Sequence, residues 1–304
     1  LALVLVGHGH VARRFVDLVD ESAPALARLG IRARVVGACT RRRGGVFDDK
    51  GLTNADIDRR LGEIAADPAA GSVAFINTAL AALHRRPYTI PIVVEATTLN
   101  VESGEPATTH VRAALAAGAD VVAANKGPVA CAYHELAAEA DASDRSFLFE
   151  GAVMDGIPVF GLVRESMAAT EVRSFRGVVN STTNFILSAM ERGESFDAAL
   201  GRMQRDGVAE ADASLDVEGW DAAAKAAALA NVWLGARTTP ARVARQGISA
   251  GTGARAIEAR KRGHRLKLVA SGRRTGEGDT ARVDVRVELV ELPGDDALAI
   301  LDDQ

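Results

Sequence analysis

A glycine-containing turn at the start of the chain limits the possible folds most strongly. Residues 1–6 are all apolar, as in a strand buried on both faces, and a helical pattern of apolar residues runs from 11 to 29. Between them lies Gly7-x-Gly9-x-x-Ala12, the spacing of a dinucleotide-binding turn. Gly7 would permit the tight turn, Gly9 would let the backbone approach a pyrophosphate, and Ala12 is small enough for helix–strand packing. A tight turn without a ligand is the alternative.

The start of the following helix is predicted to hold phosphates, because its N–H groups and positive dipole end attract anions. We therefore expect cofactor contacts at Gly7, Gly9, His10 and Val11. We interpret His8 and His10 as turn residues rather than as metal ligands.

Alternating strands and helices predict an α/β fold with a doubly wound, parallel (Rossmann-type) sheet over residues 1–149. Strand-like runs cover 31–40, 91–96, 120–124 and 146–149, helical patterns cover 54–65, 110–117 and 133–140, and 73–76 gives a weak signal. Residues 41–45 form a polar break. From residue 150 the alternation is lost, which predicts a second, α+β domain over 150–304.

The residues after the second strand are expected to contact the cofactor ribose. An acidic residue there suits the 2′-hydroxyl of NAD, whereas arginine suits the 2′-phosphate of NADP. Here the strand is followed by Arg41, Arg42 and Arg43, with no acid at its tip. The pattern favours NADP, with Arg41 as a contact, and a solvated basic loop is the alternative.

Two further strand ends carry polar residues, Thr97 after 91–96 and Lys126 after 120–124. Ligands of open α/β sheets bind outside the carboxyl ends of the strands. We therefore expect Thr97 and Lys126 to meet the Gly7 turn in one crevice, with Lys126 at the nicotinamide end. An exposed lysine at a strand end is the alternative.

An acidic run precedes an alanine-rich helical pattern in the second half. It contains Glu210, Asp216 and Asp221, and Lys225 follows Asp221 by four residues, on the same helix face. The helix is otherwise apolar, so the pair is expected to be partly buried. A lysine near carboxylates can hold a substrate oxygen and transfer a proton. An ordinary surface salt bridge is the alternative.

The composition argues against nucleic-acid and membrane partners. Thirty-six basic and 40 acidic residues give a net charge of −4, which does not suit a nucleic-acid scaffold. Two cysteines, Cys39 and Cys131, fit a reducing, cytoplasmic setting. We read no signal peptide and no apolar run of the ~18 residues that a membrane span needs, and expect no membrane partner. Because the sequence does not begin with Met, we expect a residue or two before Leu1.

Several ordered segments make the chain resemble homoserine dehydrogenases over almost its full length. They are Gly7-His-Gly-His-Val-Ala12, Val94-Glu-Ala-Thr97, Asn125-Lys126-Gly-Pro128, Gly151-Ala-Val-Met-Asp-Gly-Ile-Pro158, Gly177-Val-Val-Asn-Ser-Thr-Thr-Asn-Phe-Ile-Leu187, the 210–225 run, Gln246-Gly-Ile248 and Leu266-Lys-Leu-Val-Ala270. The resemblance implies interconversion of L-homoserine and L-aspartate 4-semialdehyde with NAD(P), in threonine and methionine biosynthesis. It also implies that the second domain forms a homodimer.

The resemblance assigns roles to individual residues. Lys225 would be the catalytic lysine, with Asp221 beside it and Lys126 between cofactor and substrate. Glu210 and Asp221 would bind the substrate amino group. The family's sodium ion, bound largely by backbone oxygens in some members, is matched by Glu150, Val153, Asp155 and Ile157. The remaining assignments place Asp216 and Thr182 on the substrate and Thr97 on the cofactor.

Departures from the family pattern are Ala12 in place of a usual glycine and an end at Gln304, where relatives usually continue with a glycine-rich segment and a helix. With no kinase domain before the turn and no regulatory domain after residue 304, we expect a monofunctional enzyme. Another amino-acid or semialdehyde dehydrogenase of this architecture and a non-catalytic NADP-binding sensor remain alternatives. The sensor would not need Lys225 or the acids around it.

Overall fold

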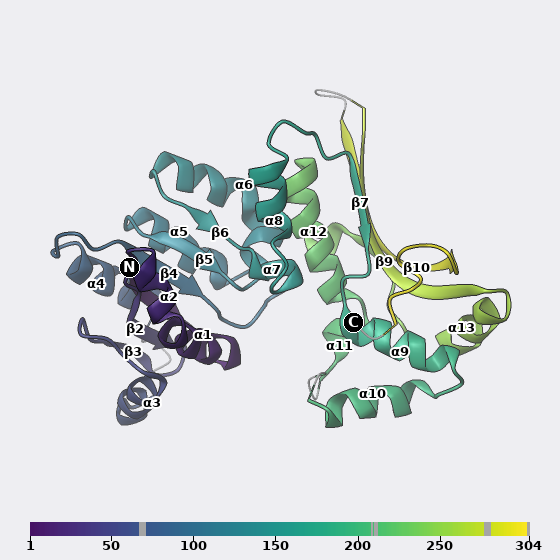
Figure 1. Ribbon diagram of the computed structural model, residues 1–304, viewed down its shortest axis with the longest axis horizontal. Coiled ribbons are helices and arrows are strands. Elements are labelled where there is room, and N and C mark those ends of the chain that lie inside the picture. The colour runs from purple at the N-terminus through teal and green to yellow at the C-terminus, as the bar shows by residue number, and fades with distance from the viewer. Residues whose placement is uncertain (67–70, 208, 210–211, 277–280, 303–304) are drawn as a thin grey trace. The chain divides into compact units, whose positions relative to one another are not determined.

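The computed structural model describes residues 1–66, 71–207, 209, 212–276 and 281–302 (Figure 1). The chain divides into two compact units, Leu1–Gly161 and Leu162–Gln304. Residues 150–161 therefore belong to the first unit, although the change in sequence pattern predicted a domain boundary at residue 150. Aromatic packing accounts for this: the ring of Phe149 meets those of Tyr133 and Phe160 edge-on, with centroids 5.6 and 4.9 Å away.

The described part of the first unit is built on a six-stranded sheet of order β3-β2-β1-β4-β5-β6. The strands are β1 (Ala2–Val6), β2 (Arg34–Thr40), β3 (Gly44–Phe47), β4 (Pro91–Glu95), β5 (Asp120–Ala123) and β6 (Phe147–Leu148). All neighbours pair in parallel except β2 and β3. The predicted parallel, doubly wound sheet is confirmed, and the carboxyl ends of β1, β2, β4 and β5 share one edge.

The helices of this unit are α1 (His10–Glu21), α2 (Ala23–Arg28), α3 (Asn54–Glu63), α4 (Ser72–Leu83), α5 (Ala107–Ala116), α6 (Gly127–Ala142), α7 (Gly151–Met154) and α8 (Val159–Gly161). The helical pattern over 11–29 is confirmed, but it forms two helices: α1 ends before Ser22, and Pro24 lies in the first turn of α2, where proline is tolerated. The weak segment 73–76 belongs to a helix. The predicted break at 41–45 is confirmed for residues 41–43, which form a turn, whereas Gly44 and Gly45 begin the edge strand β3.

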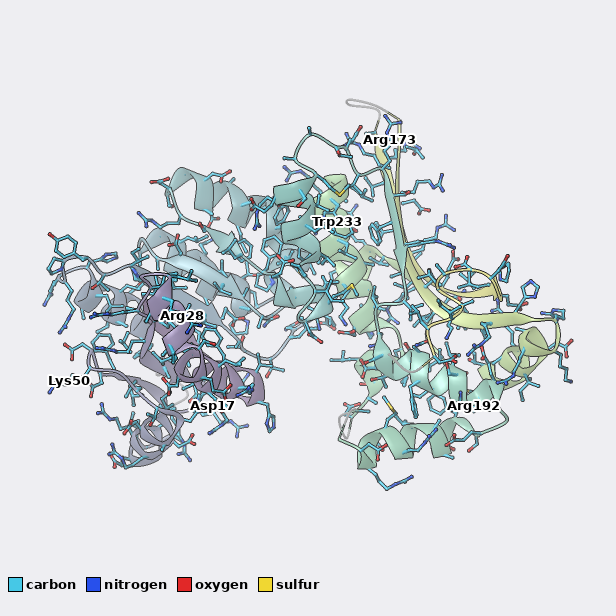
Figure 2. All side chains as sticks on the ribbon, viewed as in Figure 1. Asp17, Arg28, Lys50, Arg173, Arg192 and Trp233 are labelled. Atoms are coloured by element: carbon cyan, nitrogen blue, oxygen red, sulfur yellow. The ribbon has the colours of Figure 1, made fainter. Side chains whose placement is uncertain are left out.

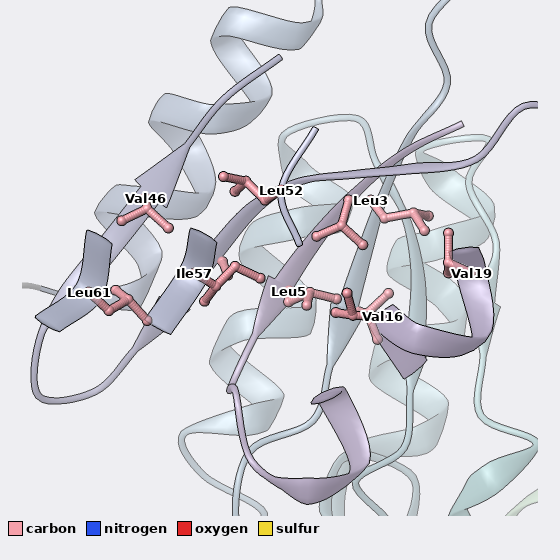
Figure 3. Packing of buried hydrophobic residues seen from close by; sticks show 11 residues of the cluster. Leu3, Leu5, Val16, Val19, Val46, Leu52, Ile57 and Leu61 are labelled. Atoms are coloured by element: carbon pink, nitrogen blue, oxygen red, sulfur yellow. The ribbon is translucent and has the colours of Figure 1, made fainter. Parts of the chain in front are cut away.

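A buried apolar cluster fixes the glycine turn in place (Figure 3). Leu3 and Leu5 of β1 pack with Val16 of α1, and Ile57 and Leu61 of α3 close the cluster. Because the residues flanking the turn on both sides are buried in one core, the turn itself has little freedom. The sheet edge can therefore present the turn as a rigid surface.

The described part of the second unit has a four-stranded sheet of order β7-β9-β10-β8. Its strands are β7 (Ser174–Gly177), β8 (Ala244–Arg245), β9 (His264–Thr275) and β10 (Arg282–Pro293), antiparallel except for β10–β8. The helices are α9 (Ser181–Glu191), α10 (Phe196–Arg205), α11 (Ser214–Val217), α12 (Trp220–Leu234) and α13 (Thr252–Lys261), with a π-helix at Leu162–Ser166 and a 3₁₀ turn at Pro240–Arg242. Helices α9, α12 and α13 all contact β9, which confirms the mixed α+β character (Figure 1).

Charged side chains of both signs cover the outside of each unit (Figure 2). Asp17 and Lys50 are exposed on the first unit, and Arg173 and Arg192 on the second. No helix within the described ranges combines the length and the apolar character that crossing a bilayer requires.

Candidate functional site

A cleft of about 850 Å³ lies at the carboxyl edge of the first unit's sheet. Its walls come from the glycine turn, from the ends of β2 and β4, and from α3 and α5. The lining residues are Gly7, His8, Gly9, Arg13, Thr40, Arg41, Arg42, Arg43, Asp58, Leu61, Gly71, Ser72, Ala96, Thr97, Thr98, Pro106 and His110. Among the predicted cofactor contacts, Gly7, Gly9, Arg41 and Thr97 are part of this lining. His10, Val11 and Lys126 are not among those residues.

Gly7 and Gly9 are glycines for different reasons. Gly7 has φ +98°, and a Cβ there would lie 2.6 Å from the carbonyl oxygen of Ala96, so both conformation and space exclude a side chain. Gly9 has φ −89°, which any residue can adopt, and a Cβ there would point into open space. That open space at the N-terminus of α1 is where a pyrophosphate needs to approach the backbone. The turn therefore fits a dinucleotide.

Basic side chains dominate the charge of the cleft. Arg41, Arg42 and Arg43 follow β2 and line it, and Nη1 of Arg43 donates to the carbonyl of Leu61 at 3.3 Å. Such a wall attracts an anionic ligand. The arrangement fits a phosphate near the end of β2.

Arg13 and Asp58 add a second charged feature to the same cleft. The two guanidinium nitrogens of Arg13 each donate to one oxygen of Asp58 at 2.5 Å. These hydrogen bonds hold the pKa of Asp58 below its ordinary value, so the carboxylate stays charged. The His8 ring, interpreted from sequence as an incidental turn residue, is almost fully buried between Asn54, 2.9 Å from its Nε2, and Asp58, 3.4 Å from its Nδ1. Neither partner is near in sequence, so sequence carried no signal for this role.

The ends of β4 and β5 are joined by side-chain hydrogen bonds. The amide of Asn125 donates to the carbonyl of Thr97 at 3.1 Å, and the hydroxyl of Thr97 donates to the buried carboxylate of Glu95. A Cβ on Gly7 would lie 3.0 Å from the Thr97 nitrogen, so the turn and Thr97 are adjacent. Lys126 follows Asn125 directly, is half-buried and precedes α6. The Gly7 turn and Thr97 meet in one cleft as predicted, whereas Lys126 is not among the residues that line it.

His110 lies behind this junction. Its Nδ1 lies 3.4 Å from Glu95, and its ring lines the cleft. Glu95 and His110 are not among the predicted site residues, because Glu95 ends an apolar strand-like run and His110 lies in a predicted helix, and the contact between them depends on the fold.

The second unit contains a separate polar cluster at the start of α12. The Nζ of Lys225 lies 3.2 Å from Oδ2 of Asp221, and the two side chains are 18% and 13% exposed. Lys225 also donates to the carbonyl of Val179 at 2.7 Å. The pair is therefore mostly buried, unlike an ordinary surface salt bridge.

Asn180, which the sequence analysis did not single out, connects this pair to another carboxylate. Its amide donates to Asp216 at 2.7 Å and to Asp221 at 3.0 Å. Thr182 lies two residues later, buried in the first turn of α9. Glu210 lies outside the described residues.

Close backbone packing supports the start of α12. Gly219 has φ +80°, and a Cβ there would lie 2.4 Å from the carbonyl oxygen of Gln246. The next residues of that segment are held as well, since Ile248 donates its backbone N–H to Val217 at 2.7 Å. The Gln246-Gly-Ile248 motif therefore packs against the start of the helix that carries Asp221 and Lys225 and stabilises its position.

The predicted sodium ligands lie in the connection that ends the first unit. The Glu150 carboxylate accepts backbone N–H bonds from Phe160 at 2.7 Å and from Gly161 at 3.0 Å. Val153 is buried in α7, whereas Asp155 and Ile157 are exposed beyond it. In the described ranges no group of three or more His, Cys, Asp or Glu side chains is placed to hold a metal ion. A cation here would need carbonyl oxygens.

Comparisons with known proteins agree on one family. The family model described as homoserine dehydrogenase, NAD binding domain, matches residues 7–150, and the model described as homoserine dehydrogenase matches 158–304. The NAD(+)-dependent homoserine dehydrogenase of Pseudomonas canavaninivorans is 37% identical over 290 residues, covering 94% of this chain and 81% of the relative. The homoserine dehydrogenase of Methanocaldococcus jannaschii is 34% identical over 275 residues, covering 88% and 79%.

A solved structure supports the same assignment. The homoserine dehydrogenase of Thiobacillus denitrificans superimposes with a TM-score of 0.78 at 31% identity, covering 99% of this chain and 64% of that one. The likeness spans both units, and the Gly7 turn lies within the match to the NAD-binding model. On sequence, fold and cleft together, the chain belongs to the homoserine dehydrogenase family.

Proposed function

We propose that this chain interconverts L-homoserine and L-aspartate 4-semialdehyde, with Lys225 as the acid–base group and NADP as the preferred cofactor. A homoserine dehydrogenase is an NAD(P)-dependent oxidoreductase that acts on the CH–OH group of homoserine. The observation that carries the residue assignment is the mostly buried pair of Lys225 and Asp221 on α12.

When bound, the nicotinamide would supply the hydride chemistry, which leaves the protein to move one proton. In the oxidative direction the neutral amine of Lys225 takes the hydroxyl proton of homoserine. In the reductive direction the ammonium form returns a proton to the developing alkoxide. Asp221 and the Val179 carbonyl keep the amine at one position for both directions.

The substrate's own ammonium group needs carboxylates. We assign this role to Glu210, Asp216 and Asp221, with Thr182 near the substrate at the start of α9. The support is chemical: carboxylates form strong charge-assisted hydrogen bonds with an ammonium group. Asp216 and Asp221 are already tied together by one amide, which makes them a preformed pair.

The preference for NADP rests on the arginines that follow β2. Arg41, Arg42 and Arg43 all line the cleft that the glycine turn opens. A guanidinium binds a phosphate with paired, charge-assisted hydrogen bonds, and the 2′-phosphate distinguishes NADP from NAD. The backbone at Gly7, Gly9, His10 and Val11 would take the pyrophosphate.

The remaining assignments follow from the position of each residue. Thr97 and Lys126 end adjoining strands, so we place them at the nicotinamide end of the cofactor. A sodium ion near Glu150, Val153, Asp155 and Ile157 would be structural, and no chemical step is assigned to it. We also propose a homodimer formed through the second unit, which light scattering would test.

A spectrophotometric assay tests the reaction. L-Homoserine is added with NADP or with NAD, and the absorbance of the reduced nicotinamide is followed. We expect turnover with both cofactors and a higher kcat/KM with NADP. Turnover with a different hydroxy amino acid but not with homoserine would point to another dehydrogenase, and cofactor binding without turnover of any substrate would point to a sensor.

A further inference from the structure

We propose that Asn180 is a positioning residue that holds the carboxylates of Asp216 and Asp221 in register with Lys225. The inference rests on the proposed acid–base role of Lys225 and deepens it. Asn180 is 6% exposed and is not among the residues that line the cofactor cleft.

The hydrogen bonds of the Asn180 amide determine its orientation. Its nitrogen has two hydrogens, and the two acceptors are Asp216 Oδ1 at 2.7 Å and Asp221 Oδ2 at 3.0 Å. Its oxygen accepts from the backbone N–H and the hydroxyl of Thr183, at 2.8 and 2.9 Å. A flipped amide would place its oxygen against two carboxylates and its hydrogens against a backbone N–H. The amide can therefore serve these partners in one orientation only.

The same arrangement sets the position of the lysine. Oδ2 of Asp221 receives both the Asn180 amide and the Lys225 amine, which lies 3.2 Å away. The amine is held on its other side by the carbonyl of Val179, the residue before Asn180. Two adjacent residues thus act on one amine, Val179 through its carbonyl and Asn180 through Asp221.

Electrostatics explains why an amide suits this position. Lys225 pairs with Asp221, and the Asn180 amide holds the carboxylate of Asp216 close to that of Asp221. Mutual repulsion would drive these two partly buried carboxylates apart. The two N–H groups of Asn180 stabilise both carboxylates without adding net charge. An aspartate in its place would add a third negative charge, and an aliphatic residue would leave the buried Asp221 and the partly buried Asp216 without those donors.

Asn180 also caps the N-terminus of α9, because its oxygen accepts from Thr183 N. The test has to separate this structural role from the positioning role. Serine and aspartate are both good N-caps. Asn180→Ser therefore keeps a capping oxygen but removes both amide N–H donors, and Asn180→Asp keeps the cap but replaces the amide by a carboxylate.

The measurements are kcat, KM, the pH profile of homoserine oxidation and Tm. We expect Asn180→Ser to lower kcat/KM for homoserine by about 10–100-fold, the effect of lost hydrogen bonds to charged groups, with the KM for the cofactor near its parental value. In Asn180→Asp, the added charge stabilises the lysine's ammonium form. The activity should then require a higher pH, because oxidation needs the neutral amine.

The matched control is Ser195→Ala, which removes the side-chain cap of α10 and touches neither carboxylate. It should lower Tm and leave kcat and the pH profile unchanged. Suppose that Lys225→Ala loses activity as expected. A parental kcat/KM in Asn180→Ser, or a parental pH profile in Asn180→Asp, would then overturn the positioning role of Asn180. An active Lys225→Ala enzyme would instead overturn the proposed acid–base role itself.

Discussion

Lys225 and Asp221 form an ion pair one turn apart on α12, 3.2 Å between Nζ and Oδ2, with both side chains mostly shielded from water. A pair at this spacing on an exposed helix stabilises it by only a few tenths of a kcal/mol. Here the pair is mostly buried at the start of an otherwise apolar helix, so the amine is held at one position instead of moving freely in solvent. A fixed amine suits a chemical role.

Removal of the lysine amine should therefore affect chemistry more than stability. We expect Lys225→Ala to lower kcat by about 10²–10⁴-fold, the usual contribution of a positioned acid–base group, with cofactor binding unchanged. Lys225→Arg should restore little activity, because a guanidinium keeps its proton. Steady-state kinetics with fluorescence titration of the cofactor checks both, and a parental kcat in Lys225→Ala would reduce the pair to a salt bridge.

Lys126 directly precedes α6 and follows Asn125, whose amide donates to the carbonyl of Thr97. If it contacts cofactor and substrate, Lys126→Ala should lower kcat/KM for homoserine with little change in Tm. Lys50→Ala is the matched control, because Lys50 is exposed on the first unit (Figure 2). A large drop in Tm with normal turnover would assign Lys126 a structural role.

Cofactor preference should respond to the end of β2. Arg41→Asp replaces an arginine of the cleft wall by an acid suited to a ribose hydroxyl, and we expect the NADP/NAD ratio of kcat/KM to fall by about 10–100-fold, since hydrogen bonds to charged groups contribute about 1.5–3 kcal/mol. Arg59→Asp on α3 is the control, because Arg59 is exposed and not among the residues lining the cleft. Equal kcat/KM for the two cofactors in the parent enzyme would show that the arginines form a solvated loop.

The glycine turn could be predicted because its geometry is local: a strand, two glycines and a helix follow one another in the sequence. The pair of Asp221 and Lys225 could be predicted for the same reason, since the helical repeat alone places them together. Asn180 could not, because its carboxylate partner Asp221 is 41 residues away. From sequence, an asparagine ahead of a helix indicates only a cap.

The environment of Lys267 in the core could not be predicted from the sequence either. It lies in the segment Leu266-Lys-Leu-Val-Ala270, where a charged side chain would be expected to reach solvent, yet it is fully buried. Its amine donates to Asn184 Oδ1 at 2.8 Å and to the carbonyl of Leu301, which are far away in the sequence. Its burial depends on tertiary contacts that hydrophobic periodicity does not encode.

Those contacts predict a large effect on stability. Lys267→Met keeps the length of the side chain but leaves buried acceptors without their donor, so we expect the free energy of unfolding to fall by about 2–5 kcal/mol. Lys261→Met is the control: Lys261 is 69% exposed in the second unit, and its loss should change stability by less than about 0.5 kcal/mol. Denaturant titration measures both, and equal midpoints for the two variants would contradict the buried role.

The two thiols should be inert in the native enzyme and should make the fold sensitive to alkali. Burial raises the pKa of Cys39 to about 12 and that of Cys131 to about 11, from 9.0. At pH 8, iodoacetamide should therefore alkylate the native thiols at least about a hundredfold more slowly than those of the unfolded chain, because the thiolate is the reactive form. Above pH 9 the unfolded chain loses its thiol protons first, so the free energy of unfolding should decrease as the pH rises from about 9 towards 12. Mass spectrometry after timed alkylation, with protein in denaturant as the control, checks the first expectation. Equal rates in the two states would show that the thiols are accessible.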